Sequence, residues 1–192
     1  IAFASSSGDF SAHLTGFRQR ISDLIQYQYD PSIFQYVPRN VNKFRSDGID
    51  AGFRAKVSRR VTVECASVLQ HANQTQDTTL VYVDAYYVPN LTWSLSSDYR
   101  VTKRIEVGSS LRFVSERWIR MYDGSEKIID RVYELSVHAA LQLSRRFTLI
   151  AVGEDLTNQK RPSQFGYTVD DRDYPGPGRR FYLRLTAAVG HE

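Results

Sequence analysis

The sequence predicts an all-β protein, namely antiparallel strands of a transmembrane β-barrel with short periplasmic turns and long extracellular loops. Three observations support this fold class. Apolar and polar residues alternate, a motif recurs about every 43 residues, and short connections alternate with long ones. Alternation places one set of side chains on each face of a strand. Short turns at one end and long loops at the other are typical of outer-membrane barrels.

The composition excludes several classes of protein. With 192 residues, 42% hydrophobic and 12% aromatic, the chain can bury apolar surface and is not expected to be disordered. The net charge of +4 is spread without basic blocks, which argues against a nucleic-acid partner. Cys65 is the single cysteine and no His or Cys pair has metal-ligand spacing, so we expect no disulfide, metal or cofactor. The chain lacks a run of about 18 apolar residues, which excludes a transmembrane helix.

The recurring motif predicts a series of tight turns. It consists of a small hydroxyl residue and two cations, followed by an apolar, a polar and an apolar residue. The three copies are Ser58-Arg59-Arg60, Thr102-Lys103-Arg104 and Ser144-Arg145-Arg146, and residues 6–10 form a looser fourth copy. Each copy is expected to end one strand and begin the next.

The strands beside these turns follow the two-residue period. Alternation is clear over residues 49–57, 61–65, 91–101, 105–113, 133–143 and 181–185, and it is weak only over 147–154. Eight full strands fit the chain, with a partial strand at residues 1–4. On the apolar face we expect lipid contact from Leu91, Trp93, Leu95, Leu111, Phe113, Leu135, Val137, Leu141, Phe181, Leu183 and Leu185. On the polar face we expect Glu64, Glu106, Arg112, Glu134, His138 and Arg184 to line a lumen.

The lengths of the connections predict which end of the strands faces the periplasm and which faces the outside of the cell. Those near residues 5–9, 58–60, 102–104 and 144–146 are short, and those near 24–44, 70–84, 116–128 and 156–179 are long. Five or six apolar positions per strand cover about 33 to 40 Å of chain, and a tilt near 40° projects this onto about 25 to 30 Å. This height matches a bilayer. A soluble barrel with an apolar interior remains an alternative.

The last quarter of the chain resembles a known family. Residues 152–160, Val-Gly-Glu-Asp-Leu-Thr-Asn-Gln-Lys, are similar to a Val-Glu-Asn-Leu-x-Asn/Asp-x-Lys segment, with Asp155 in place of the usual Asn. Residues 174–185 contain a Pro-Gly-Arg-x-Phe-x-Leu pattern. In this order the two segments resemble the closing strands of TonB-dependent outer-membrane receptors. Weaker matches at residues 17–25, 48–50, 88–99 and 112–117 extend the resemblance over nearly the whole chain.

The resemblance implies a 22-stranded barrel, plugged by an N-terminal domain, that takes up scarce nutrients such as metal chelates, vitamins or saccharides. Residues 1–192 would form about the last eight or nine strands, without the plug domain and the TonB box. The implied partners are outer-membrane lipid, the remaining barrel strands and plug in the same or a separate chain, the TonB complex and the barrel-assembly machinery. The implied location is the bacterial outer membrane.

Two alternatives remain because the chain departs from the family pattern. The family normally ends on an aromatic residue, whereas this sequence ends at Glu192. One alternative is a barrel wall piece that acts as a scaffold in a larger outer-membrane assembly. The other is a stand-alone eight-stranded barrel. Side chains would just fill the interior of a barrel of that size.

The long loops carry the candidate ligand residues, which are Tyr36, Arg39, Trp118, Arg120, Arg161 and Tyr167. Aromatic rings with Arg suit rings, saccharides or anionic chelates, although they also suit a membrane-interface girdle. We expect Asp170, Asp171 and Asp173 to be a solvated acidic loop and not a cation site. Ser136 and His138 share a face, but residues i and i+2 lie about 7 Å apart on a strand, too far for a catalytic pair. We therefore expect no enzyme activity.

Overall fold

A computed structural model describes residues 2–22, 25–30, 32–40, 43–75, 82–85, 88–120, 126–159 and 177–188. In chain order the strands are β1 (Ala2–Ser7), β2 (Phe10–Ser22), β3 (Ile25–Asp30), β4 (Gln35–Asn40), β5 (Lys43–Lys56), β6 (Val61–Thr75), β7 (Tyr82–Asp84), β8 (Leu91–Arg100), β9 (Ile105–Val114), β10 (Arg117–Arg120), β11 (Glu126–Ile129), β12 (Val132–Gln142), β13 (Phe147–Glu154) and β14 (Arg180–Ala187). Over these residues, no helix is long and apolar enough to cross a membrane. The predicted all-β class is confirmed.

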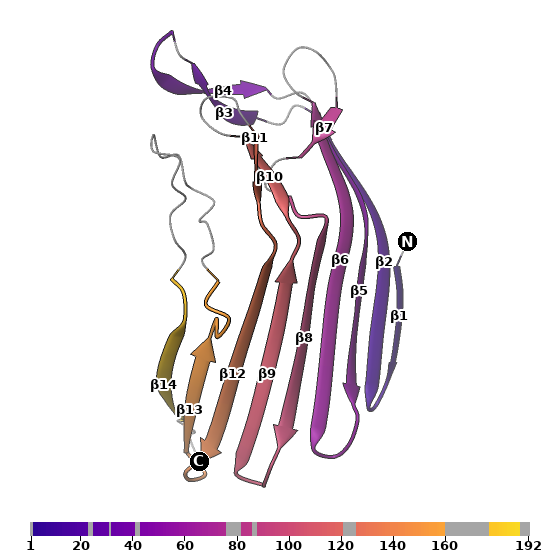
Figure 1. The fold of residues 1–192 in the computed structure, drawn as a ribbon. Coiled ribbons are helices and arrows are strands. Elements are labelled where there is room, and N and C mark those ends of the chain that lie inside the picture. Colours follow the sequence, from indigo (N-terminus) through magenta and orange to yellow (C-terminus); the bar gives the residue numbers. More distant parts are fainter. Residues whose placement is uncertain are drawn as a thin grey trace.

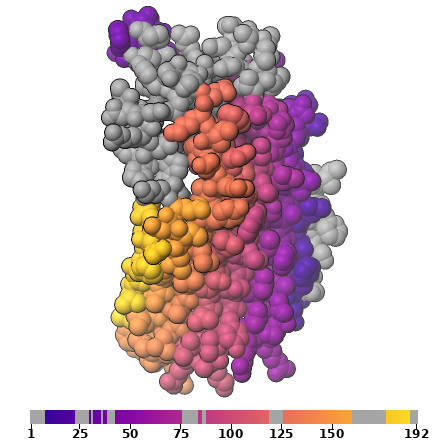
Figure 2. All heavy atoms as spheres, viewed as in Figure 1, coloured from indigo at the N-terminus to yellow at the C-terminus, as the bar shows by residue number. Residues whose placement is uncertain are grey.

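Nine of the strands form one curved antiparallel wall (Figure 1), in the order β1-β2-β5-β6-β8-β9-β12-β13-β14, and β7 pairs with β6. Figure 2 shows the side chains of neighbouring strands packed side by side across this wall. Within the described residues, β1 and β14 each pair on one side only and do not pair with each other. Over the described residues the wall is therefore open, whereas a stand-alone eight-stranded barrel would be closed.

The strand register divides the wall into an apolar and a polar face. One row of side chains crosses five neighbouring strands on the apolar face: Phe53, Cys65, Leu95, Leu111 and Leu135. All eleven residues expected to contact lipid lie on this face, and all six expected to line a lumen lie on the other.

The apolar face is not an interior core. Leu95 is 42% exposed and Leu183 is 72% exposed. Within the described residues, the buried hydrophobic residues are Ala72, Ala85, Ile129 and Val132, too few and too small for the core of a soluble barrel. The soluble-barrel alternative is therefore wrong for this wall.

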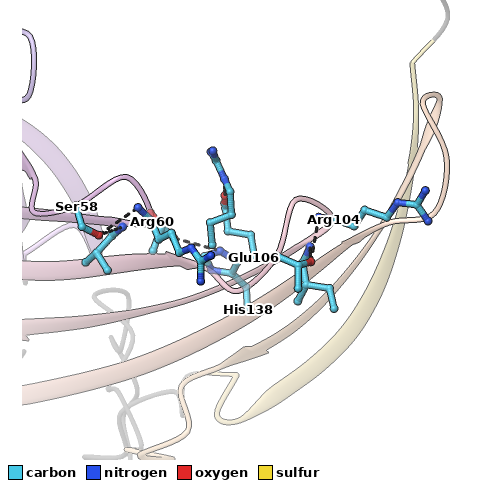
Figure 3. A network of polar contacts seen from close by, with 10 residues as sticks. Ser58, Arg60, Arg104, Glu106 and His138 are labelled. Atoms are coloured by element: carbon cyan, nitrogen blue, oxygen red, sulfur yellow. Dashed lines mark hydrogen bonds and ion pairs between the residues drawn. The ribbon is translucent and has the colours of Figure 1, made fainter.

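The hydroxyl residue of each recurring motif closes its turn. The Ser58 side-chain oxygen accepts hydrogen bonds from the backbone N–H groups of Arg60 and Val61, both at 3.2 Å (Figure 3). The Thr102 oxygen accepts the same two bonds at 3.1 and 3.0 Å, and the Ser144 oxygen accepts them at 3.2 Å. The repeat is thus a local side-chain-to-backbone turn, the kind that hydroxyl residues favour.

Replacing Ser144 with Ala is expected to lower the free energy of unfolding of the complete barrel by about 0.5 to 1.5 kcal/mol, because two N–H groups lose their acceptor. Ser144→Thr keeps the oxygen and should stay close to the wild type. Unfolding in urea from detergent micelles measures both. Equal losses for Ala and Thr would show that the hydroxyl does not hold the turn.

Short hairpins lie at the other end of the wall from these turns (Figure 1). β3 pairs with β4, β10 pairs with β11, and β7 extends the upper part of β6. β6 runs to Thr75 and β5 begins at Lys43, so both enter segments that we expected to be loops. Residues 70–75 carry polar side chains on both faces of β6, so the apolar–polar alternation that marks a strand in the sequence fades there.

Candidate ligand site and polar wall

The hairpin β10–β11 places a cation and a large aromatic ring at the far end of the wall, opposite the short turns. Arg117 pairs with Ile129, and Trp118 pairs with Ile128. Ile129 is buried and Trp118 is 40% exposed. The Arg117 Nε atom is buried and has no hydrogen-bond partner among the described residues. Burial lowers the pKa of Arg117 from its ordinary value, yet a guanidinium keeps its charge.

The expected ligand residues lie in separate places. Tyr36 and Arg39 are in β4, opposite Tyr29 and Gln26, and Trp118 and Arg120 are in β10. Both hairpins are at the same end of the wall (Figure 1). Arg161 and Tyr167 lie outside the described residues, as do Asp170, Asp171 and Asp173.

The motif at residues 152–160 connects the ends of β12, β13 and β14 that lie away from the short turns through side-chain hydrogen bonds. The Thr157 hydroxyl donates to the Tyr133 carbonyl at 2.7 Å, and the Gln159 side-chain oxygen accepts from the Tyr133 N–H at 2.7 Å. The Asn158 side-chain oxygen accepts from the Arg179 N–H at 3.2 Å. Asp155 has φ 49°, in the left-handed region that Asn and Asp tolerate. This geometry accounts for an Asp where Asn is usual, and it gives the motif a structural role.

The polar face carries cross-strand ion pairs. Arg54 meets Glu64 at 3.1 Å, Arg180 meets Glu154 at 2.6 Å, and Arg100 meets Glu106 at 4.0 Å. These side chains are substantially exposed, so each pair contributes only about 0 to 1 kcal/mol. A hollow of about 520 Å³ opens on this face, and its polar lining includes His13, Arg54, Glu64, Ser94 and Ser96. This face suits water or polar protein groups.

A group of three potential metal ligands lies near the short turns. The His138 Nε2 atom is 3.3 Å from an Asp98 carboxylate oxygen, and one ligand atom from each of Asp98, Glu106 and His138 lies within 4.8 Å of the others (Figure 3 labels Glu106 and His138). A Cβ at Gly108 would overlap both Asp98 and His138, so the glycine allows their approach. Glu106 also faces Arg100. The three residues therefore form a cluster of polar side chains that the strand register brings together.

Sequence reasoning did not find this group, because its members come from three different strands. His138 was considered with Ser136, but its contact is with Asp98. Arg117 was also missed, since its burial depends on how the hairpin packs. For the group of Asp98, Glu106 and His138, the signal is the pairing of the strands. His138 lies opposite Gly108, and Gly108 lies opposite Asp98.

A scan against protein-family models found no match, and a search of curated proteins found none either. Solved structures do match. The copper transporter OprC superposes with a TM-score of 0.77 at 17% identity, covering 96% of this chain and 30% of that chain. The FrpB iron transporter from Neisseria meningitidis (F3-3 variant) gives 0.74 at 18%, covering 97% and 30%. The siderophore receptor PiuA from Acinetobacter baumannii gives 0.71 at 14%, covering 97% and 27%.

The likeness therefore extends over almost all of this chain but less than a third of each matched protein. The matched proteins are TonB-dependent receptors with outer-membrane β-barrels. At these identities the shared property is the fold. This chain has the fold of part of the β-barrel of the TonB-dependent outer-membrane receptors that it matches.

Proposed function

We propose that residues 1–192 are the C-terminal part of the barrel of a TonB-dependent receptor in the bacterial outer membrane, and that the complete receptor takes up a metal chelate. The observation that carries this proposal is the likeness over nearly the whole chain to proteins described as a copper transporter, an iron transporter and a siderophore receptor. These descriptions favour metal chelates over vitamins or saccharides.

The wall also requires partners. Unpaired strand edges are costly in lipid, where no water satisfies the backbone groups. We therefore infer that further strands join β1 and β14, from the same or a separate polypeptide, and that a plug occupies the polar interior. The TonB complex and the barrel-assembly machinery complete the set of partners that such a receptor uses.

The ligand would meet the far end of the wall. Trp118 offers an exposed ring on which a chelate can stack. Tyr36, Arg39, Arg120, Arg161 and Tyr167 belong to the same set of proposed contacts. Catalysis has no part in this function.

The test is uptake by whole cells that produce the complete receptor. Cells receive radiolabelled ferric catecholate, ferric hydroxamate or copper, with and without a functional TonB complex. We expect TonB-dependent uptake of one of these. Trp118→Ala should raise the half-saturation concentration about three- to tenfold, as expected for a lost stacking contact. Tyr99→Ala, an exposed aromatic change at the opposite end of the wall, should leave it unchanged.

The second candidate is a scaffold, and the exposed outer edge of β14 favours it because such an edge can accept a strand from another chain. Correct insertion without TonB-dependent uptake of any probe would reject the metal-chelate receptor. Co-purification of a partner through the β14 edge would then support the scaffold.

A further inference from the structure

Four cations gather on the apolar-face side of two neighbouring strands, beyond the apolar rows. They are Arg18 and Arg20 in β2 and Lys43 and Arg45 in β5, and we call them the cationic patch. In β2 the even-numbered residues share the face of Leu14, and in β5 the odd-numbered residues share the face of Ile49. The patch therefore continues the lipid-facing surface, at the end away from the short turns.

Among the residues that the structure describes, the charges of the patch are unbalanced. Asp47 forms ion pairs with Arg18 and with Arg45, the latter at 2.6 Å. One carboxylate thus serves two of the four cations. Arg20 lies directly opposite Arg45 in the register, and like charges in this position destabilise a sheet. From β6, the groups facing Asp47 and Arg45 are His71 and Asn73, which bring no negative charge. Within the described residues the patch therefore keeps an excess of positive charge.

The height of the patch matches a lipid headgroup. Arg45 is four residues beyond Ile49, which is about 13 Å along a strand and about 10 Å along the membrane normal at a tilt near 40°. Ile49 and Leu69 are exposed apolar residues directly below. A groove of about 720 Å³ runs from this apolar level to the lower edge of the patch, and its lining includes Gly16, Arg18, Asp47, Ile49, Leu69 and His71. Its apolar lower part suits an acyl chain, and its upper part ends at the Arg18–Asp47 ion pair, where Asp47 also contacts Arg45.

We propose that the cationic patch and this groove bind a phosphorylated glycolipid of the outer leaflet, with a headgroup phosphate between Arg20 and Arg45 and an acyl chain along Ile49 and Leu69. Guanidinium groups bind phosphate oxygens through paired, charge-assisted hydrogen bonds. The site goes beyond the uptake function, and it depends on the membrane orientation of the wall and not on any transported ligand.

The test uses the complete protein in detergent micelles, titrated with bisphosphorylated lipid A and monitored by native mass spectrometry. Arg20→Gln/Arg45→Gln should weaken binding at least about tenfold, as expected for lost charge-assisted bonds. Arg59→Gln/Arg60→Gln removes the same charge from a short turn at the opposite end and should not change the affinity. Dephosphorylated lipid A should bind the wild type as weakly as phosphorylated lipid A binds the double variant.

A second measurement separates binding from folding. Without lipid A, Arg20→Gln relieves the repulsion with Arg45 and should raise the unfolding midpoint or leave it unchanged. With lipid A, the wild type should gain stability and the variant should gain less. Equal lipid A affinity in wild type and double variant would overturn the proposal. Competition by millimolar inorganic phosphate that displaces the lipid completely would also overturn it, because the site would then recognise free anions.

Discussion

Leu95→Arg is expected to destabilise the complete barrel by about 2 to 4 kcal/mol, the cost of a cation near the bilayer midplane. Leu95 lies midway along β8, in the apolar row between Cys65 and Leu111, and its side chain is 42% exposed. In a membrane this exposure means contact with acyl chains. Equilibrium unfolding from phospholipid vesicles measures the change directly.

Ser94→Arg is the matched control, because it places the same side chain on the opposite face one residue away. Ser94 borders the hollow on the polar face, where water can hydrate a guanidinium. Its cross-strand neighbour Arg112 is a cation, so a loss of up to about 1 kcal/mol is expected from like charges. If the two variants lose equal stability in vesicles, the assignment of the apolar face to lipid is wrong.

Gly48→Ala is expected to lower the free energy of unfolding by about 1 to 3 kcal/mol, as overpacking does at a closely packed position. An added Cβ at Gly48 would lie 2.5 Å from the Phe17 ring and 2.6 Å from the Leu69 carbonyl oxygen. The ring can move, but the carbonyl belongs to the β5–β6 ladder. Relief therefore requires the two strands to separate locally. Urea unfolding of the complete barrel in micelles measures the loss.

Gly8→Ala gives the comparison for this prediction. No heavy atom lies within 4 Å of a Cβ added at Gly8, so its effect should stay within about 0.5 kcal/mol. Phe17→Leu/Gly48→Ala tests the mechanism further. It removes the ring contact but leaves the carbonyl contact, so most of the loss should remain. Full recovery in this double variant would show that the ring, and not the backbone, excludes the side chain.

The wall could be predicted because its information is local. Period-two alternation identifies both faces of β8, β9, β12 and β14, and all eleven residues expected on the apolar face are there. The Ser144 turn was also predicted, since its hydroxyl contacts N–H groups only two and three residues away. β13 alternates poorly in sequence because Ile150 and Val152 lie on the polar face. Its place in the sheet depends on pairing with β12 and β14.

The candidate sites were harder to predict because they join residues that are distant in sequence. Asp98, Glu106 and His138 come together only when β8, β9 and β12 pair in one register. Arg20 and Arg45 become opposite neighbours only when β2 pairs with β5. The sequence by itself determined the two-faced strands, the tight turns and the family resemblance, since each depends on residues that are close together in the sequence. The tertiary structure alone decided that the wall is open over the described strands and which charges face one another, because both depend on hydrogen bonding between strands far apart in the chain.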